Sequence, residues 1–261
     1  MNNFKLTLVQ KICLAGLFIP LVAIFQKIFA VKYIPVIPFV RISFGGPALI
    51  MLASIILGPW FGLLVGAASD LIGFFIFDPK MFGAMPFLQI TAIYALLGFS
   101  TYFVFRFVHK IKSTKIMLIT ELVTFVLLLV GVTLFVTLSD SIVLYGTTYE
   151  FTTLVKILVP IILFILLAIL FVIIIFMGKY FKKKEINIST IHISYSCFIL
   201  ELTVMLIFGT LMKVWAFSST TFLAIFISQL AVFFFNVPLN AFLLTNLINI
   251  SKRVFRTEKE Q

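Results

Sequence analysis

Long apolar stretches separated by short polar connections run through almost the whole chain. Most of these stretches are close to the ~20 residues that a helix needs to cross a bilayer. The pattern therefore predicts an all-α integral membrane protein with about eight transmembrane helices. We expect them at 12–30, 43–58, 60–77, 85–108, 116–138, 154–177, 191–213 and 221–250. The second and third are short, and short helices interrupted by Gly or Pro commonly border a cavity.

Glycine residues recur through the short second and third stretches. Gly58, Gly62 and Gly66 are spaced so that a helix places them along one face. Such a stripe of small residues lets two helix backbones approach closely in lipid, where packing drives association. Because proline cannot continue a helix across it, the Gly58-Pro59 step predicts two helices joined by a very tight turn.

The composition excludes a water-soluble domain. Hydrophobic residues make up 62% of the chain and charged residues 11%, and no soluble fold of this length hides so much apolar surface. The net charge of +11 is compatible with nucleic-acid binding, but the positive charges fall at predicted helix ends, as membrane topology signals do. We therefore expect the lipid bilayer to surround the chain and expect no nucleic-acid partner.

The positive charges also predict the orientation. Most Lys and Arg residues precede the first predicted helix or follow the fourth, sixth and eighth. The positive-inside rule places these segments in the cytoplasm. We expect a multi-pass protein of the plasma membrane with both termini cytoplasmic and with Gly83 and Tyr145 outside.

The three connections expected outside differ in character. The first, KYIPVIPFV, contains two prolines and is expected to be extended. The second, DPKMFGAMP, is rich in turn formers, a composition compatible with a flap. The third, SDSIVLYGTTYE, lacks Lys and Arg, as do loops that cover a ligand and many ordinary surface loops.

Two equal spacings indicate an internal repeat. Gly131 and Gly209 have the same separation as Pro160 and Pro238, within the same frame of helix, outer loop and helix. The last helix pair is therefore expected to duplicate the region 116–180. Chance similarity between apolar helices is the alternative.

The segment PFVRISFGGPALIMLASIILGPWFGLLVGAASDLIGFFIF resembles the substrate-binding S component of energy-coupling factor (ECF) vitamin transporters, especially the folate-type branch. That branch has an Arg-x-Ser-Phe-Gly opening, then a Gly-Pro turn, then a Gly-x-x-x-Asp-x-x-Gly helix. The segment LYGTTYEF also resembles the fifth connection of this branch. The matching residues are Arg41, Ser43, Phe44, Gly45, Gly58, Pro59, Gly66, Asp70 and Gly73.

The resemblance implies a six-helix core, here residues 1–185, that captures a folate-like vitamin from outside. It also implies a membrane coupling subunit and two cytoplasmic ATPases as partners. The chain departs from this pattern because 186–261 adds a helix pair, and because Ile19 interrupts the expected alanine docking motif of the first helix. The residues predicted to dock a partner are Ala15, Ala23, Gly62 and Gly66.

The predicted substrate-binding residues are Arg41, Phe44, Asp70, Phe74, Gln89, Thr91 and Tyr94. The planar fork of Arg41 suits a ligand carboxylate, although snorkelling to the interface also explains its position. Asp70 lies deep in its helix, where an ionised side chain is costly unless paired. The side chain of Asp70 has three alternative roles: it contacts a ligand, it acts as a proton-sensitive switch, or it forms a helix–helix hydrogen bond. Gln89, Thr91 and Tyr94 fall within little more than one turn and are expected to offer polar contacts to a flat ring.

Three further charged residues are candidates on weaker grounds. Glu121 and Glu201 are intramembrane acids and therefore functional candidates, with Lys115 as a nearby partner for Glu121. Lys156 either neutralises an anionic ligand or anchors the end of its helix.

Several catalytic motifs are missing from the sequence. It contains no Gly-x-x-x-x-Gly-Lys-Ser/Thr phosphate loop, no HExxH and no Gly-x-Ser-x-Gly. We therefore expect a transport protein that is not an enzyme, without cofactor or metal, whose partners hydrolyse ATP. The alternatives are an S component for another vitamin or precursor and a non-transporting membrane scaffold.

Overall fold

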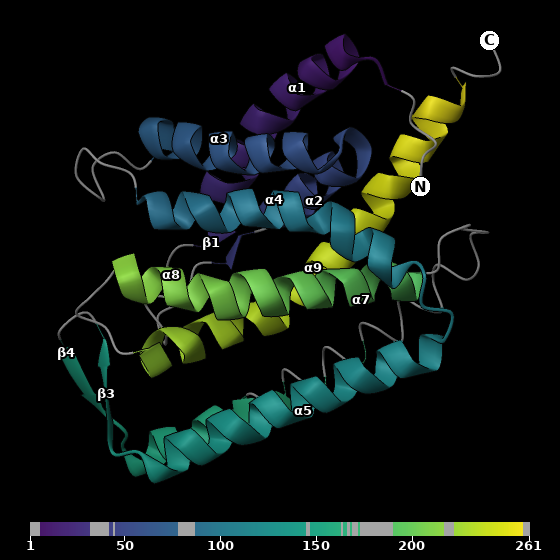
Figure 1. The fold of residues 1–261 in the computed structure, drawn as a ribbon. Helices are drawn as coiled ribbons and strands as arrows, with labels where there is room; N and C mark the ends of the chain where they lie inside the picture. The colour runs from purple at the N-terminus through teal and green to yellow at the C-terminus, as the bar shows by residue number, and fades with distance from the viewer. Residues whose placement is uncertain are drawn as a thin grey trace.

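The computed structural model describes residues 6–31, 42, 43, 45–77, 87–144, 147–162, 164, 165, 168, 172, 190–216 and 222–257. These residues are mostly helical (Figure 1). Six of the described helices are long and apolar enough to cross a membrane, which confirms a multi-pass, predominantly α-helical membrane protein. They are α1 (Leu8–Lys27), α3 (Pro59–Phe77), α4 (Leu88–Val108), α5 (Thr114–Leu138), the continuous helix Thr190–Ala216 and α9 (Phe222–Thr257).

The second predicted span differs from the expectation. It is a short helix, α2 (Gly46–Leu57), whose 12 residues extend about 18 Å, less than the ~30 Å hydrocarbon core of a bilayer. All of its residues except Ile55 are buried. The other short apolar helix, Thr153–Ile162, coincides with the beginning of the predicted sixth span, 154–177. Because α2 is covered by other helices, it is a core helix and not a full-length span.

The predicted break at Gly58-Pro59 is confirmed. α2 ends at Leu57 and α3 begins at Pro59. Gly58 has φ +101°, a conformation that only glycine adopts readily. Proline is tolerated at the first position of a helix, where its missing N–H needs no partner. The two helices therefore meet through a single glycine.

The structure contains four short strands in its described part that the sequence analysis did not predict. β1 (Ala30–Val31) pairs with β2 (Ile42–Ser43), and β3 (Ser141–Leu144) pairs antiparallel with β4 (Thr147–Glu150). The third outer connection, expected to be a loop, is therefore a hairpin. Its run of β-branched residues and Tyr149 favours strands over an irregular loop.

The span Thr190–Ala216 contains a change of helix type. α7 (Thr190–Leu200) passes into a π-helix, η1 (Glu201–Phe208), and then into α8 (Gly209–Ala216). π-Helical turns are rare and occur frequently at functional sites. Glu201, one of the two predicted intramembrane acids, begins this segment.

One apolar core joins the N-terminal and C-terminal helices. Buried side chains of α2, such as Met51, pack in the same cluster as Cys197 of α7 and Leu244 of α9. The helices after residue 186 are therefore built into the main core. The division into 1–185 and 186–261, and the duplication of 116–180, stay predictions.

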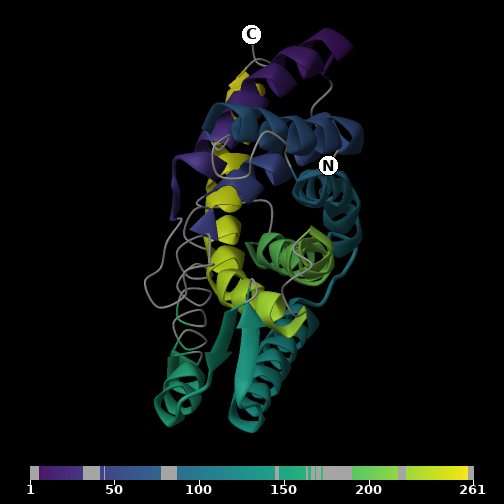
Figure 2. The same cartoon turned by 90° about the vertical axis from the view of Figure 1, so that its left-hand side faces the viewer.

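A second, aromatic cluster attaches α5 to this core. The ring centroid of Phe125 lies 5.3 Å from the ring centroid of Phe198, 5.2 Å from that of Phe233 and 5.3 Å from that of Phe234. On its other faces α5 is largely exposed. In Figure 2, α5 and the β3–β4 hairpin extend away from the layers formed by α1 to α4.

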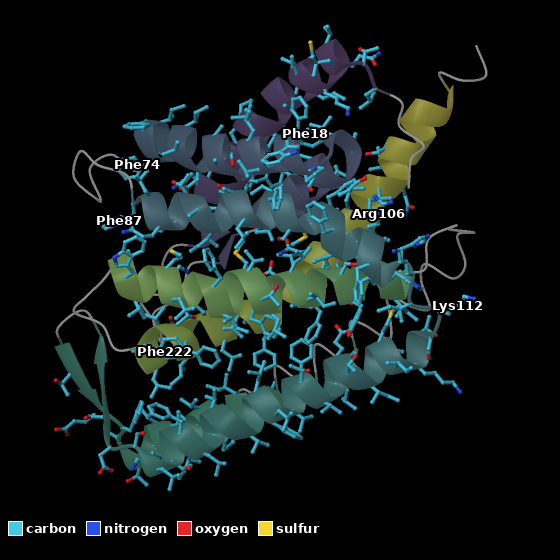
Figure 3. All side chains as sticks on the ribbon, in the orientation of Figure 1. Phe18, Phe74, Phe87, Arg106, Lys112 and Phe222 are labelled. Atoms are coloured by element: carbon cyan, nitrogen blue, oxygen red, sulfur yellow. The ribbon has the colours of Figure 1, made fainter. Side chains whose placement is uncertain are left out.

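Basic residues and phenylalanines mark opposite ends of the molecule. Arg106 and Lys112 lie at one end, and Phe74, Phe87 and Phe222 lie at the other (Figure 3). The beginning of α1 and the end of α9 lie at the same end as Arg106 and Lys112 (Figure 1). This arrangement agrees with both termini on one side, while the identity of that side stays a prediction.

Candidate functional site

Two of the predicted substrate-binding residues meet between α3 and α4. The Thr91 hydroxyl donates a hydrogen bond of 2.7 Å to Oδ2 of Asp70. Oδ1 of the same carboxylate lies 3.8 Å from Nζ of Lys27 at the end of α1. All three side chains are buried. Lys27, Asp70 and Thr91 therefore link three helices, and we call them the Asp70 node.

Close backbone contact between α3 and α4 makes the Asp70 node possible. A Cβ atom at Gly62 would lie 2.5 Å from the Gly98 carbonyl oxygen, and one at Gly66 would overlap the Tyr94 carbonyl. Small residues at these positions let the two backbones touch. Side chains as short as Asp and Thr can then meet across the interface.

Gly73 provides the space for Lys27. A Cβ atom at position 73 would lie 2.9 Å from Cε of Lys27. The aliphatic stem of Lys27 therefore crosses α3 over Gly73, which brings its ammonium group to Asp70. A buried ion pair needs such support, because removing both charges from water is costly.

The sequence interpretation did not place Lys27 in the site. Lys27 is one of the few Lys and Arg residues outside the segments assigned to the cytoplasm. The available signal was its position in the last turn of the first helix, in the expected outer half of the membrane. That signal does not select α1 as the neighbour of α3, so the pairing could not be derived from it.

The other predicted binding residues have different environments. Phe74 is buried one turn beyond Asp70, with its ring 5.6 Å from Phe75. Gln89 is half-buried, and Tyr94 packs against the main core. Thr91, one of the three polar residues proposed on α4, joins the Asp70 node. Arg41 and Phe44 lie outside the described residues.

The predicted docking residues all make internal contacts. Ala15 and Ala23 are buried, and a Cβ atom at Gly73 would lie 3.6 Å from that of Ala23. Gly62 and Gly66 face α4. Each of the four therefore has a packing role within this chain, and a role in docking a partner stays a prediction.

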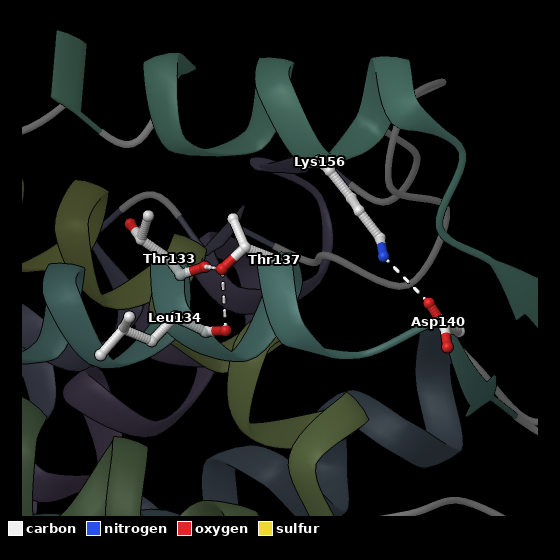
Figure 4. Close-up of polar contacts among 5 residues, drawn as sticks. All are labelled: Thr133, Leu134, Thr137, Asp140 and Lys156. Atoms are coloured by element: carbon white, nitrogen blue, oxygen red, sulfur yellow. Dashed lines mark hydrogen bonds and ion pairs between the residues drawn. The ribbon is translucent and has the colours of Figure 1, made fainter.

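Lys156 anchors the end of its helix. Its Nζ lies 3.0 Å from Oδ1 of Asp140, just before the β3–β4 hairpin (Figure 4). The carboxylate is almost fully exposed to solvent. Of the two roles considered for Lys156, this contact supports the helix anchor.

The two intramembrane acids are both buried. Glu121 on α5 is 2% exposed and Glu201 at the start of η1 is 1% exposed. Lys115, the expected partner of Glu121, is exposed, and none of the ion pairs in the described part of the chain joins the two. The expectation of that pair was wrong because the Glu121 side chain turns inward, toward α7.

Known proteins do not identify the site. Within the described residues, no group of three or more His, Cys, Asp and Glu side chains is arranged to hold a metal ion. No protein-family model, no curated protein and no solved structure matches the chain.

Proposed function

We propose that this chain is the substrate-binding membrane subunit of an energy-coupling factor-type importer for a folate-like vitamin. It captures the vitamin from outside and delivers it through a membrane coupling subunit driven by two cytoplasmic ATPases. The chain itself performs no catalysis and uses no cofactor. It resides in the plasma membrane with both termini in the cytoplasm.

The observation that carries the proposal is the Asp70 node. Asp70 and Thr91 were selected from the sequence as site residues, and they are joined to each other in the structure. Intramembrane ionisable residues are functional candidates because burying a charge without a role is costly. Asp70 precedes Phe74 on α3 and Thr91 follows Phe87 on α4, each by four residues, and these two phenylalanines lie at the end of the molecule opposite Arg106 and Lys112 (Figure 3).

The proposal assigns different roles to the charged residues. Arg41 receives a ligand carboxylate through two parallel charge-assisted hydrogen bonds. The Lys27–Asp70 pair fixes the relative positions of α1, α3 and α4, on which the ligand rests. Asp70 is therefore a positioning residue in this scheme, since its carboxylate is held by Lys27 and Thr91.

The first experiment identifies the ligand. Detergent-purified full-length protein is analysed by mass spectrometry for a co-purified small molecule and is then titrated with folic acid, riboflavin and thiamine. We expect saturable binding of folic acid and none of the other two. Binding of riboflavin or thiamine alone would support an S component for another vitamin, and binding of none would overturn the proposal.

The second experiment tests Arg41. Loss of a hydrogen bond to a charged group costs roughly 1.5–3 kcal/mol, or about ten- to a hundredfold in affinity. Arg41→Ala should weaken folic acid binding by that factor, and Arg41→Lys by less, because lysine keeps the charge and loses the planar fork. Lys110→Ala, an exposed cation beyond the end of α4, is the matched control. Unchanged affinity in a folded Arg41→Ala protein would remove the anionic-ligand argument.

A further inference from the structure

A basic connection joins α4 to α5 at one end of the molecule. The stretch 106–115 carries four Lys and Arg residues and contains no Asp or Glu. These four residues, whose side chains are all exposed, are Arg106, Lys110, Lys112 and Lys115. We call them the corner patch, and Arg106 and Lys112 mark its place in Figure 3.

The corner patch has no counter-charge among the described residues. None of the ion pairs between described side chains uses any of its four cations. The next acid along α5 is Glu121, which is buried and has its polar neighbour on α7. Because the four cationic side chains are exposed, their charge is accessible to a partner outside the chain.

Hydrogen bonds and ring contacts hold the connection between α4 and α5 against α7. The N–H of Ile111 donates a hydrogen bond of 3.0 Å to the carbonyl of Val108, which is fully buried. The Ile111 carbonyl in turn accepts a hydrogen bond of 3.0 Å from Nε2 of His192 on α7. The ring centroids of His109 and His192 lie 5.9 Å apart. The cations therefore project from an ordered turn, and groups that are already ordered lose less entropy when they bind a ligand.

Exposed apolar side chains continue from the corner patch along both helices. On α4, Phe103 and Phe107 are exposed and share a face with Arg106. On α5, three exposed residues share a face with Lys115, namely Leu118, Ile119 and Leu122. Each helix thus presents cations at its end and apolar side chains toward the middle of the bilayer. An anionic phospholipid has the complementary order, a charged headgroup followed by acyl chains.

The corner patch also lies at the depth of lipid headgroups. α4 and α5 are both long and apolar enough to cross a membrane, and the patch joins the end of one to the beginning of the other. This depth is the same whichever side of the membrane the connection faces. Clusters of Lys and Arg next to a membrane helix attract anionic lipids, and the planar fork of Arg suits phosphate oxygens.

A topology signal alone does not require this arrangement. The positive-inside rule depends on the number of Lys and Arg residues in a connection and not on their fixed positions. The hydrogen-bonded turn and the apolar faces that continue from it are additional features, and both suit a bound lipid.

We propose that the corner patch is a binding site for the headgroup of an anionic phospholipid, whose acyl chains lie along the exposed apolar faces of α4 and α5. Arg106 and Lys110 contribute charge from the end of α4, and Lys112 and Lys115 from the beginning of α5. This site is separate from the Asp70 node and does not depend on the vitamin proposal.

The test compares two lipids that differ only in their headgroups. Full-length protein in detergent is titrated with dioleoylphosphatidylglycerol, which is anionic, or with dioleoylphosphatidylcholine, which is zwitterionic, and bound lipids are counted by native mass spectrometry. We expect tighter binding of the anionic lipid to the wild-type protein. Each cation removed near the headgroups should weaken its binding about fivefold. Lys112→Gln should therefore lose about fivefold, and the double variant Lys110→Gln/Lys112→Gln roughly twenty-five-fold.

Matched controls separate lipid binding from general effects of charge. Lys112→Arg keeps the charge and should retain the affinity, and so should Lys156→Gln, which removes a cation beside the β3–β4 hairpin, at the other end of the molecule (Figure 1). Glycerol 3-phosphate, which has the phosphate but no acyl chains, should not displace the lipid at equal concentration.

Three results would overturn the proposal. They are equal affinity of the wild-type protein for the two lipids, a preference for the anionic lipid that the double variant retains, and displacement of the lipid by glycerol 3-phosphate. Equal affinity for the two lipids would instead favour an acidic protein surface as the partner of the corner patch.

Discussion

The surroundings of Asp70 and of Glu121 are two solutions to the same problem, a carboxylate buried within a helical membrane protein. At the Asp70 node, glycines bring α3 and α4 into backbone contact, and Asp70 receives both a hydroxyl donor and an ammonium group. Near Glu121, the ring of Phe125 on α5 packs against rings of α7 and α9. The polar neighbour of Glu121 there is Ser194 of α7, and no ion pair reaches its carboxylate in the described residues.

The difference shows how side-chain size controls polar pairing. Short side chains such as Asp and Thr reach across an interface only where the backbones are close. Large aromatic side chains fill volume and exclude water, but they hold helices apart. A polar group beside them depends on the few polar side chains within its reach, as Glu121 does on Ser194.

Removing one member of the buried ion pair should have the largest effect. Asp70→Ala leaves Lys27 buried without its counter-charge, a change that costs about 3–5 kcal/mol. The free energy of unfolding, measured in mixed micelles, should fall by this amount, and the double variant Lys27→Met/Asp70→Leu should recover part of the loss. Asp140→Ala at the exposed pair is the control, and equal stability of Asp70→Ala and wild type would contradict a structural ion pair.

The second prediction concerns the close backbone contact between α3 and α4 at Gly66. Gly66→Ala places a methyl group against the Tyr94 carbonyl, and overpacking of this kind costs about 1–3 kcal/mol. Gly131→Ala on α5 meets nothing within 4 Å. It should instead stabilise the helix by roughly 0.5–1 kcal/mol, since alanine is the better helix former. The same unfolding assay measures both, and a shared sign would show that close backbone approach is not what distinguishes α3–α4.

Deleting a hydroxyl tests the hydrogen bond of the Asp70 node. Thr91→Val removes the hydrogen bond to Asp70 and should cost about 0.6–1.7 kcal/mol, as measured for hydrogen bonds between membrane helices. The same unfolding assay provides the measurement. Equal stability of Thr91→Val and the wild type would contradict a structural hydrogen bond at the node.

The smallest effect is expected at the exposed ion pair of Lys156 and Asp140. Surface ion pairs contribute about 0–1 kcal/mol, and salt screens them. A double-mutant cycle of Lys156→Ala and Asp140→Ala should give a coupling energy in that range that decreases in 1 M KCl. A coupling energy above about 2 kcal/mol would show that this exposed pair is as strong as a buried ion pair, and would contradict the prediction.

The lengths of the apolar runs, and the glycine and proline residues that end helices, were sufficient to predict most of the helices. Most expected ranges agree with the described helices within a few residues, although α9 continues seven residues beyond the predicted end at 250, and the Gly58-Pro59 break occurs where predicted. α2 was assigned as a span because its apolar run looks like a short membrane helix. Only its burial by surrounding helices shows it to be part of the core. The β3–β4 hairpin was missed because a strand of four residues gives too weak a local pattern.

The candidate site was predictable only in part. Asp70 and Thr91 were both chosen from the sequence, but their hydrogen bond was not, and Lys27 was overlooked. Glu121 and Glu201 were recognised as intramembrane acids, whereas the asparagines of α9 that adjoin Glu201 were not. A polar residue in an apolar stretch is visible in sequence, but its partner on another helix is not.

The sequence by itself determined that the chain crosses a membrane several times, where α2 gives way to α3, and between which helices most Lys and Arg residues fall. These properties depend on the local length of apolar runs, on the chemistry of glycine and proline, and on charge near helix ends. Only the tertiary structure decided that α2 is buried, that the C-terminal helices belong to the main core, and that Lys27 pairs with Asp70. Those outcomes depend on which helices lie side by side and how closely, because a buried charge is stabilised by a partner that the packing brings within a few ångströms.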